Sequence, residues 1–88
     1  MKGRDTIKSN ARKILANNIV YFRLKNGWSQ EDFADKLGTT PTYLSTIENA
    51  KKNCRIDYID HIASVLNIKV SQLFEERQNV GNRRISRR

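Results

Sequence analysis

A stretch near the middle of the chain carries the start and stop signals of two short helices that meet at a tight turn. Ser29 can cap the first helix, and Asp32 three residues later completes a capping box. Gly38 provides the left-handed residue with which helices commonly end. Thr40 and Pro41 then provide a new N-cap and a first helical position, where the missing N–H of proline is no loss. The sequence therefore predicts two helices separated by a turn of only a few residues.

The second of these helices has two distinct faces when its residues are projected at about 100° per residue. Apolar Leu44 and Ile47 fall on the inward face, together with Glu48. The opposite face carries short hydrogen-bonding side chains at i, i+3, i+4 and i+7, namely Thr42, Ser45, Thr46 and Asn49. Such an exposed stripe, on a helix held at a turn to another helix, suits the edges of base pairs in a major groove. We therefore expect these four residues to read DNA bases.

This segment resembles the helix-turn-helix of the Cro/CI-type (Xre-like) family, which includes phage repressors and restriction-modification controller proteins. The matching positions are Gln30, Ala34, Gly38, Leu44, Ile47, Glu48 and Asn49. The resemblance extends from about residue 14 to about residue 74. It implies an all-α fold, a compact five-helix lambda-repressor-like DNA-binding domain whose helix-turn-helix is formed by helices 2 and 3.

Apolar residues at helical spacing predict three more helices outside the motif. The helix that follows the motif is marked by Ile56, Ile59, Ile62, Ala63 and Leu66. The expected helices cover residues 10–25, 56–66 and 70–77, the first ending at Asn26 and Gly27 and the second at Asn67.

The length of 88 residues predicts one DNA-binding domain, at 10–77, without a separate sensor domain. A flexible basic arm is expected at 1–9 and a flexible basic tail at 78–88; of the formal charge of +8, these ends carry +2 and +4. Basic ends suit sequence-independent contact with DNA phosphate, although solubility alone explains them as well. No apolar run of about 18 residues and no secretion signal is present, so we expect a cytoplasmic protein without a membrane partner.

The resemblance also implies contacts with DNA phosphate or with a groove around the motif. They are implied for Ser29, Gln30, Tyr43, Lys51, Lys52 and Arg55. Some phage repressors carry an arginine at the place of Arg55 that enters the minor groove. The alternatives are an ordinary solvated turn for the two lysines and an exposed helix-start residue for Arg55. The exposed face of the second motif helix has no Arg, Lys or Gln, and Pro41 cannot donate a hydrogen bond, so we expect an A·T-leaning binding site.

Other residues are expected to hold the structure together. The resemblance implies a buried ion pair between Arg23 and Glu48, and the helical projection independently places Glu48 on the inward side. Trp28 stands where a hydrophobic staple belongs and is expected in the core, against Phe33.

A homodimer is expected through the last helix, which in the resembled family often meets its two-fold mate. The apolar residues in excess of what a small core needs are Ile68, Val70 and Phe74. An ordinary core role explains the same three residues equally well.

Enzymatic chemistry has no support in the sequence. Cys54 and His61 each occur once, and for His61 we expect a surface ion pair with Asp57. No catalytic residues, no metal site and no cofactor are therefore expected. The sequence predicts a small homodimeric transcriptional regulator that binds double-stranded DNA sequence-specifically. The alternative is the DNA-binding antitoxin of a toxin–antitoxin pair, and RNA polymerase or a toxin protein is left open as a further partner.

Overall fold

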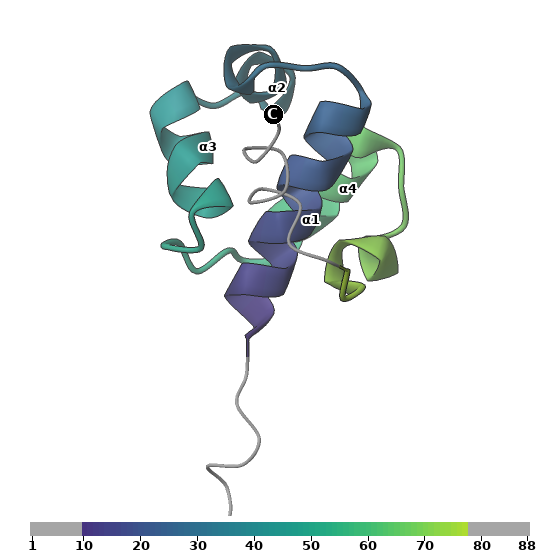
Figure 1. Cartoon of the computed structure of the whole chain (residues 1–88). Coiled ribbons are helices and arrows are strands. Elements are labelled where there is room, and N and C mark those ends of the chain that lie inside the picture. The colour runs from purple at the N-terminus through teal and green to yellow at the C-terminus, as the bar shows by residue number, and fades with distance from the viewer. Residues whose placement is uncertain (1–9, 78–88) are drawn as a thin grey trace, which may run out of the picture.

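The computed structural model describes residues 10–77, so the expected arm and tail lie outside the described residues. The elements are α1 (Ala11–Lys25), α2 (Gln30–Leu37), α3 (Pro41–Glu48), α4 (Ile56–Leu66) and the 3-10 helix η2 (Val70–Phe74). The described part of the chain contains no strand. In Figure 1, α1 runs through the middle of the molecule, with α3 on one side of it and α4 on the other. The all-α prediction is confirmed for residues 10–77, but this range holds four α-helices and one 3-10 helix instead of five α-helices.

The caps predicted for the two motif helices are present. Ser29 Oγ accepts a hydrogen bond from the Asp32 N–H, and the Ser29 N–H donates to Asp32 Oδ2, both at 3.0 Å. The bond from the Ser29 N–H, followed by the Ser29 side chain, holds the pKa of the Asp32 carboxyl below its usual range. Gly38 ends α2 with a φ of 78°, and Thr40 Oγ1 accepts from the Tyr43 N–H at 3.1 Å to start α3. The start and end of α2 and the start of α3 therefore follow from neighbouring residues, as expected.

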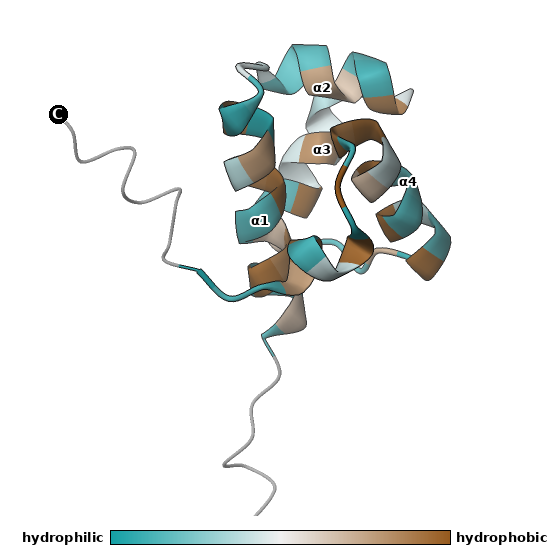
Figure 2. Ribbon diagram, turned by 90° about the vertical axis from the view of Figure 1, so that its right-hand side faces the viewer, coloured by the Kyte–Doolittle hydropathy of each residue, from teal (hydrophilic) through white to brown (hydrophobic). Residues whose placement is uncertain are grey.

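Every element contributes one large apolar side chain with no exposed surface to a common core. These side chains are Ile19 of α1, Phe33 of α2, Leu44 of α3, Ile62 of α4 and Leu73 of η2. Burying each of them stabilises the fold by about 1.5–3 kcal/mol relative to leaving it in water. Figure 2 shows the hydrophobic segments of the helices mostly turned towards one another, with the hydrophilic segments outside. Packing of this kind fixes the position of α3 relative to the rest of the domain.

The apolar residues that predicted α4 extend one turn beyond the part of the helix that is buried. Ile59 and Ile62 are buried as expected, but Ile56 keeps 79% of its surface exposed. Ile56 is the first residue of α4, which begins beyond the edge of the core, so its side chain has nothing to pack against. The predicted helix bounds are correct, but Ile56, the first apolar residue of the pattern, lies outside the core.

The last predicted helix is shorter and of a different type, because a buried side chain takes over its carbonyl groups. Asn18 in α1 is fully buried, and its Nδ2 donates to Leu73 O at 2.8 Å and to Glu75 O at 2.7 Å. Its Oδ1 accepts a hydrogen bond from Arg77 Nε. An α-helix over 70–77 would need the Leu73 carbonyl for the N–H of Arg77. The chain therefore leaves the helix at Phe74 and continues in an extended conformation at Glu75.

Candidate nucleic-acid interface

The turn between α2 and α3 holds the two helices in a fixed relation. The Thr39 N–H donates to Ala34 O at 2.9 Å and the Gly38 N–H to Asp35 O at 3.1 Å, which closes the end of α2 before Pro41 starts α3. Ala34 and Leu44, on the facing sides of the two helices, have no exposed surface. A tight turn with a packed helix contact of this kind is typical of a helix-turn-helix.

The predicted ion pair between Arg23 and Glu48 is present and shielded from solvent. Arg23 Nε lies 2.7 Å from Glu48 Oε2, and Arg23 Nη2 donates to Glu48 Oε1 at 3.1 Å. The two side chains are only 10% and 4% exposed. Arg23 Nη1 also donates to the backbone oxygen of Trp28 at 2.9 Å. The pair therefore ties the end of α3 to α1 and to the segment that leads into α2.

Gln30 takes part in this network. Its Nε2 donates to Glu48 Oε1 at 2.8 Å, so the side chain links the first residue of α2 to the last residue of α3. A primary amide has two N–H donors, so one stays available for a phosphate. Ser29 is exposed, and its hydroxyl is used as an acceptor in the cap, which leaves its O–H to donate. Phosphate contact by Ser29 and Gln30 stays a prediction.

The four expected base-reading residues differ in how accessible they are. Thr42 and Asn49 are exposed, whereas Ser45 and Thr46 are half-buried. The Thr46 hydroxyl donates to Tyr43 O at 2.6 Å, and Asn49 Nδ2 donates to Ser45 O at 2.9 Å and to Ser45 Oγ at 3.2 Å. Asn49 stands just after α3, as its C-cap. In this state Thr46 offers a methyl group and acceptor lone pairs. Asn49 Oδ1 can accept from an adenine amino group, whereas Nδ2 must leave Ser45 before both amide atoms can bond to the base.

The loop after α3 contains the lysines expected at the DNA backbone. Lys51 is exposed, and its N–H donates to Thr46 O at 2.9 Å, which folds the loop back against α3. The Lys52 ammonium lies 5.5 Å from the centre of the Tyr43 ring, which brings two other predicted contact residues together. Ala50 adopts a φ of 62°, a left-handed conformation that costs an L-residue about 1–2 kcal/mol. Nothing in the local sequence pattern indicated this conformation.

Arg55 and the proposed dimer residues lie at the surface of other elements. Arg55 is the exposed N-cap of α4 and its side chain makes no capping hydrogen bond. Val70 and Phe74 are each 39% exposed, and Ile68 is half-buried against the core. Leu24, which the sequence pattern did not single out, is 36% exposed. Partial exposure leaves room for a partner at Val70 and Phe74, and the dimer contact stays a prediction.

His61 and Cys54, for which no catalytic or metal-binding role was expected, have different surroundings. His61 Nε2 lies 2.9 Å from Leu37 O, and His61 forms no ion pair with Asp57, so the predicted surface pair is wrong. The end of α2 presents its unpaired carbonyl to the imidazole, which is a closer partner than a side chain on the same helix. Cys54 is a half-buried free thiol, and burial raises its pKa, with a smaller opposite effect from Lys52.

The described residues offer neither a metal-binding cluster nor a membrane-spanning helix. Among residues 10–77, no group of three or more His, Cys, Asp or Glu side chains could hold a metal ion. Within the same range, no helix has the length and apolar character needed to cross a membrane.

Comparison with known proteins gives the family. A family model described as Helix-turn-helix (HTH_3) matches residues 19–73. The control protein C.SmaI of Serratia marcescens is 30% identical over 82 residues, covering 93% of this chain and 96% of that protein. A Neisseria meningitidis protein named as a hypothetical transcription factor is 37% identical over 62 residues, which cover 70% of this chain and span only 58% of that protein.

The fold agrees with a solved structure. The crystal structure of the hypothetical transcription factor NHTF from Neisseria matches with a TM-score of 0.72 and 32% sequence identity, over 86% of this chain and 84% of that chain. The match of residues 19–73 includes α2, the turn and α3, the same elements from which the resemblance was inferred. That resemblance is confirmed, and the chain belongs to the helix-turn-helix family.

Proposed function

We propose that this protein is a small homodimeric transcriptional regulator that binds double-stranded DNA sequence-specifically. The observation that carries the proposal is the helix-turn-helix of α2 and α3, in which a buried ion pair ties the end of α3 to α1 and Thr42 and Asn49 are exposed on the polar side. A helix held in this way can enter a major groove without further ordering. Two of the relatives described above are named a hypothetical transcription factor and a control protein, which supports a regulatory role. Such a protein works in the cytoplasm, where it meets DNA.

In the proposed complex, α3 lies in the major groove. Thr42 reaches base edges directly, since it is exposed in the first turn of α3. Asn49 favours adenine, and the threonine methyl groups favour the methyl group of thymine. Contacts by Ser45 and Thr46 require the DNA to come close to their half-buried side chains. An A·T-leaning site follows from this set of side chains.

Phosphate contacts would fix the position of α3 in the groove. The start of α2 offers Ser29, one N–H of Gln30 and the first backbone N–H groups of the helix. Lys51 and Lys52 stand in the loop that follows α3, and the Lys52 ammonium lies 5.5 Å from the centre of the Tyr43 ring, so these three residues would contact phosphate beyond the end of the recognition helix. Arg55 would reach the minor groove beyond them. These contacts carry orientation more than sequence preference.

A homodimer would place two copies of α3 in successive major grooves. Val70 and Phe74 are the exposed apolar side chains on η2, and Ile68 stands just before them. Burial of these residues in a two-fold contact would remove apolar surface from water. The two half-sites would then be about one helical turn, roughly 10 base pairs, apart.

The test is selection of a binding site from a random DNA library, followed by fluorescence-anisotropy titration of the selected duplex and a scrambled one. We expect an A·T-rich consensus with two half-sites, a preference of about 1000-fold or more, and two protomers bound. Asn49→Ala should reduce the preference, and Ser64→Ala, at an exposed position of α4 outside the motif and outside the proposed dimer contact, is the control. Equal binding to both duplexes would contradict the proposal, and a G·C-rich consensus would contradict the proposed readout.

The antitoxin alternative is not adopted. It would require a toxin partner, and none of the relatives described above is an antitoxin by its name.

A further inference from the structure

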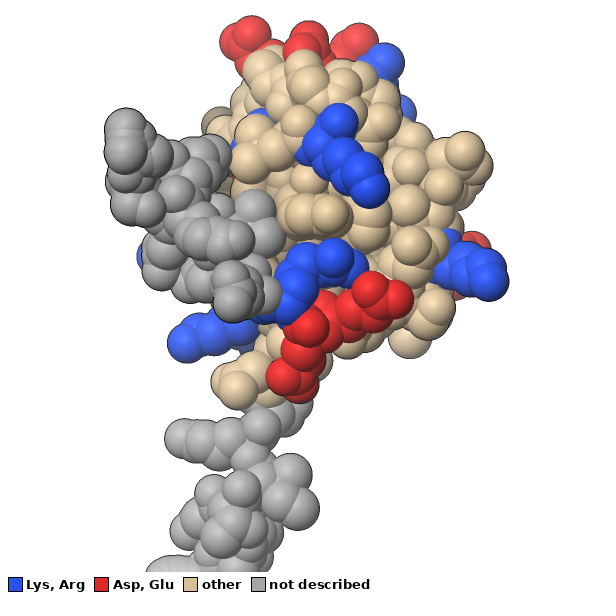
Figure 3. Space-filling view, turned by 45° about the vertical axis from the view of Figure 1, so that its right-hand side comes forward, with Lys and Arg blue, Asp and Glu red and all other residues tan. Residues whose placement is uncertain are grey.

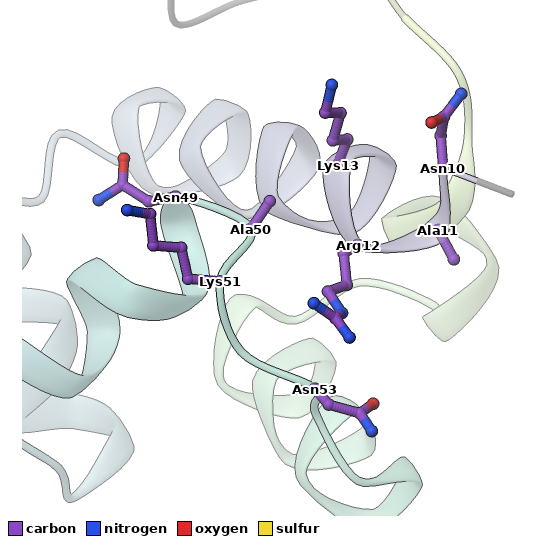
Figure 4. A pocket seen from close by; sticks show the side chains of 8 residues that line it. All are labelled: Asn10, Ala11, Arg12, Lys13, Asn49, Ala50, Lys51 and Asn53. Carbon is purple, nitrogen blue, oxygen red and sulfur yellow. The ribbon is translucent and has the colours of Figure 1, made fainter.

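An open hollow lies between the first turn of α1 and the loop that follows α3. Its volume is about 640 Å³, and its lining includes Asn10, Arg12, Lys13, Asn49, Lys51 and Asn53. The hollow therefore joins the start of α1, which lies outside the helix-turn-helix, to the end of the recognition helix. Figure 4 shows this arrangement, with α1 on one side of the loop and α3 on the other.

The charge of this surface is of one sign. Arg12, Lys13 and Lys51 line it, and none of the lining residues is acidic. All three are exposed, and none forms an ion pair with another residue in the range 10–77. Figure 3 shows a different pattern on another face, where basic and acidic side chains lie next to one another and acidic side chains gather over α2. The hollow is thus a basic surface whose charges are not paired with acidic side chains of residues 10–77.

The start of α1 adds hydrogen-bond donors to these charges. Asn10 is the N-cap, but its side chain makes no capping hydrogen bond, and the first turn contains no acidic residue. The first intrahelical bond is donated by the Ile14 N–H to Asn10 O, so the backbone N–H groups before it have no partner within α1. Arginine and lysine in a first turn are unfavourable to a helix, since the helix dipole is positive there. An anion placed in the hollow would relieve this repulsion.

The spread of the charged groups favours an extended anion over a small one. In Figure 4, Arg12 points from α1 towards the loop near Asn53, Lys13 leaves the same turn in another direction, and Lys51 lies on the α3 side with Asn49. The cationic groups are therefore distributed over the hollow instead of meeting at one point. Such a distribution matches a run of phosphates along a nucleic-acid strand, which carries one charge at each nucleotide.

We propose that the hollow holds the phosphodiester backbone of the DNA that α3 reads, with Arg12 and Lys13 as phosphate contacts together with Lys51. This inference rests on the proposed function, because it needs α3 in the major groove. Asn49 belongs both to the expected base-reading set and to the lining of the hollow, so a strand whose bases meet Asn49 continues towards Arg12. The footprint on DNA then extends past the helix-turn-helix to the start of α1. The added contacts raise affinity without changing the selected sequence.

The test compares the full-length protein with two doubly substituted variants of equal charge. Arg12→Gln with Lys13→Gln removes the contacts on α1. Lys25→Gln with Lys36→Gln removes the same charge from the last turns of α1 and α2, away from the hollow. Each protein is titrated on the selected duplex and on the scrambled duplex over a series of salt concentrations. Circular dichroism checks that both variants keep the helical fold.

We expect the slope of log K against log salt to become shallower by about 0.9 for each lost phosphate contact, hence about 1.8 per protomer for Arg12→Gln with Lys13→Gln. The control variant should keep the slope of the unaltered protein, and all three proteins should select the same sequence. If the unaltered protein prefers the selected duplex but both variants have the same slope, the hollow is not a phosphate site and the proposed function stands. If the unaltered protein shows no preference, the proposed function fails, and the slopes on the scrambled duplex still decide whether the hollow contacts phosphate.

Discussion

The buried ion pair between Arg23 and Glu48 allows a quantitative prediction about stability. The Glu48 carboxylate accepts hydrogen bonds from Arg23 at 2.7 and 3.1 Å and from Gln30 at 2.8 Å, and its side chain is 4% exposed. Glu48→Gln keeps the shape of the side chain and one acceptor oxygen but removes the negative charge. Arg23 then stays positively charged in a site that water hardly reaches.

The size of the effect follows from this burial. Two unit charges about 4 Å apart attract each other by about 4 kcal/mol at an effective dielectric constant of about 20. Loss of one partner from a buried pair costs about 3–5 kcal/mol, because the remaining charge is left uncompensated. We therefore expect Glu48→Gln to lower the free energy of unfolding by at least about 3 kcal/mol. Arg23→Met combined with Glu48→Leu should cost less than the single substitution, since no buried charge remains.

Urea unfolding followed by far-UV circular dichroism measures these differences, because small single domains usually unfold in one cooperative step. The control is Glu75→Gln, which removes a carboxylate from the Arg77–Glu75 pair, where Glu75 is 56% exposed. Exposed pairs contribute about 0–1 kcal/mol, so this variant should resemble the unaltered protein. The reasoning would be refuted if Glu48→Gln lost no more stability than Glu75→Gln, or if Arg23→Met combined with Glu48→Leu lost more stability than Glu48→Gln alone.

Three further substitutions test other features of the structure. Asn18→Leu should lower the free energy of unfolding by about 2–4 kcal/mol, because it leaves the carbonyls of Leu73 and Glu75 without their donor. A loss below about 1 kcal/mol in urea unfolding would contradict this expectation. Ala50→Gly should be neutral to stabilising by about 1 kcal/mol in thermal unfolding, because glycine adopts the φ of 62° without a Cβ penalty, and a clear destabilisation would speak against the left-handed conformation. Phe74→Glu should shift the proposed dimer to a monomer, measured by light scattering, without loss of helical content, because Phe74 is 39% exposed in the single chain. An unchanged dimer would place the interface elsewhere.

The ends of the motif helices were predictable because each depends on residues close together in the chain. Ser29 with Asp32, Gly38, and Thr40 with Pro41 carry the information for stopping and starting a helix within a few positions. The same is true of Asn67, which ends α4 in the left-handed conformation with a φ of 60°. The inward side of Glu48 also followed from helical periodicity, although its partner was implied only by the family resemblance.

Accessibility within the candidate DNA-binding face could be predicted only in part. The projection of α3 placed Thr42, Ser45, Thr46 and Asn49 on one side, but two of these four are half-buried. A projection describes one helix alone and does not include what neighbouring segments cover. It also cannot show that Asn49 and Ser45 bond to each other.

The sequence by itself determined the helix-turn-helix, its caps and its family, because these depend on short-range spacing of residue types. Only the tertiary structure decided the role of Asn18, whose partners Leu73 and Glu75 lie more than 50 positions away. The same holds for the early end of η2, which follows from those bonds, and for the exposure of Ile56 beyond the edge of the core. The basic hollow between α1 and the loop after α3 likewise exists only once distant segments are folded together. Local signals act through neighbouring backbone groups, whereas burial and long-range hydrogen bonds depend on how the whole chain packs.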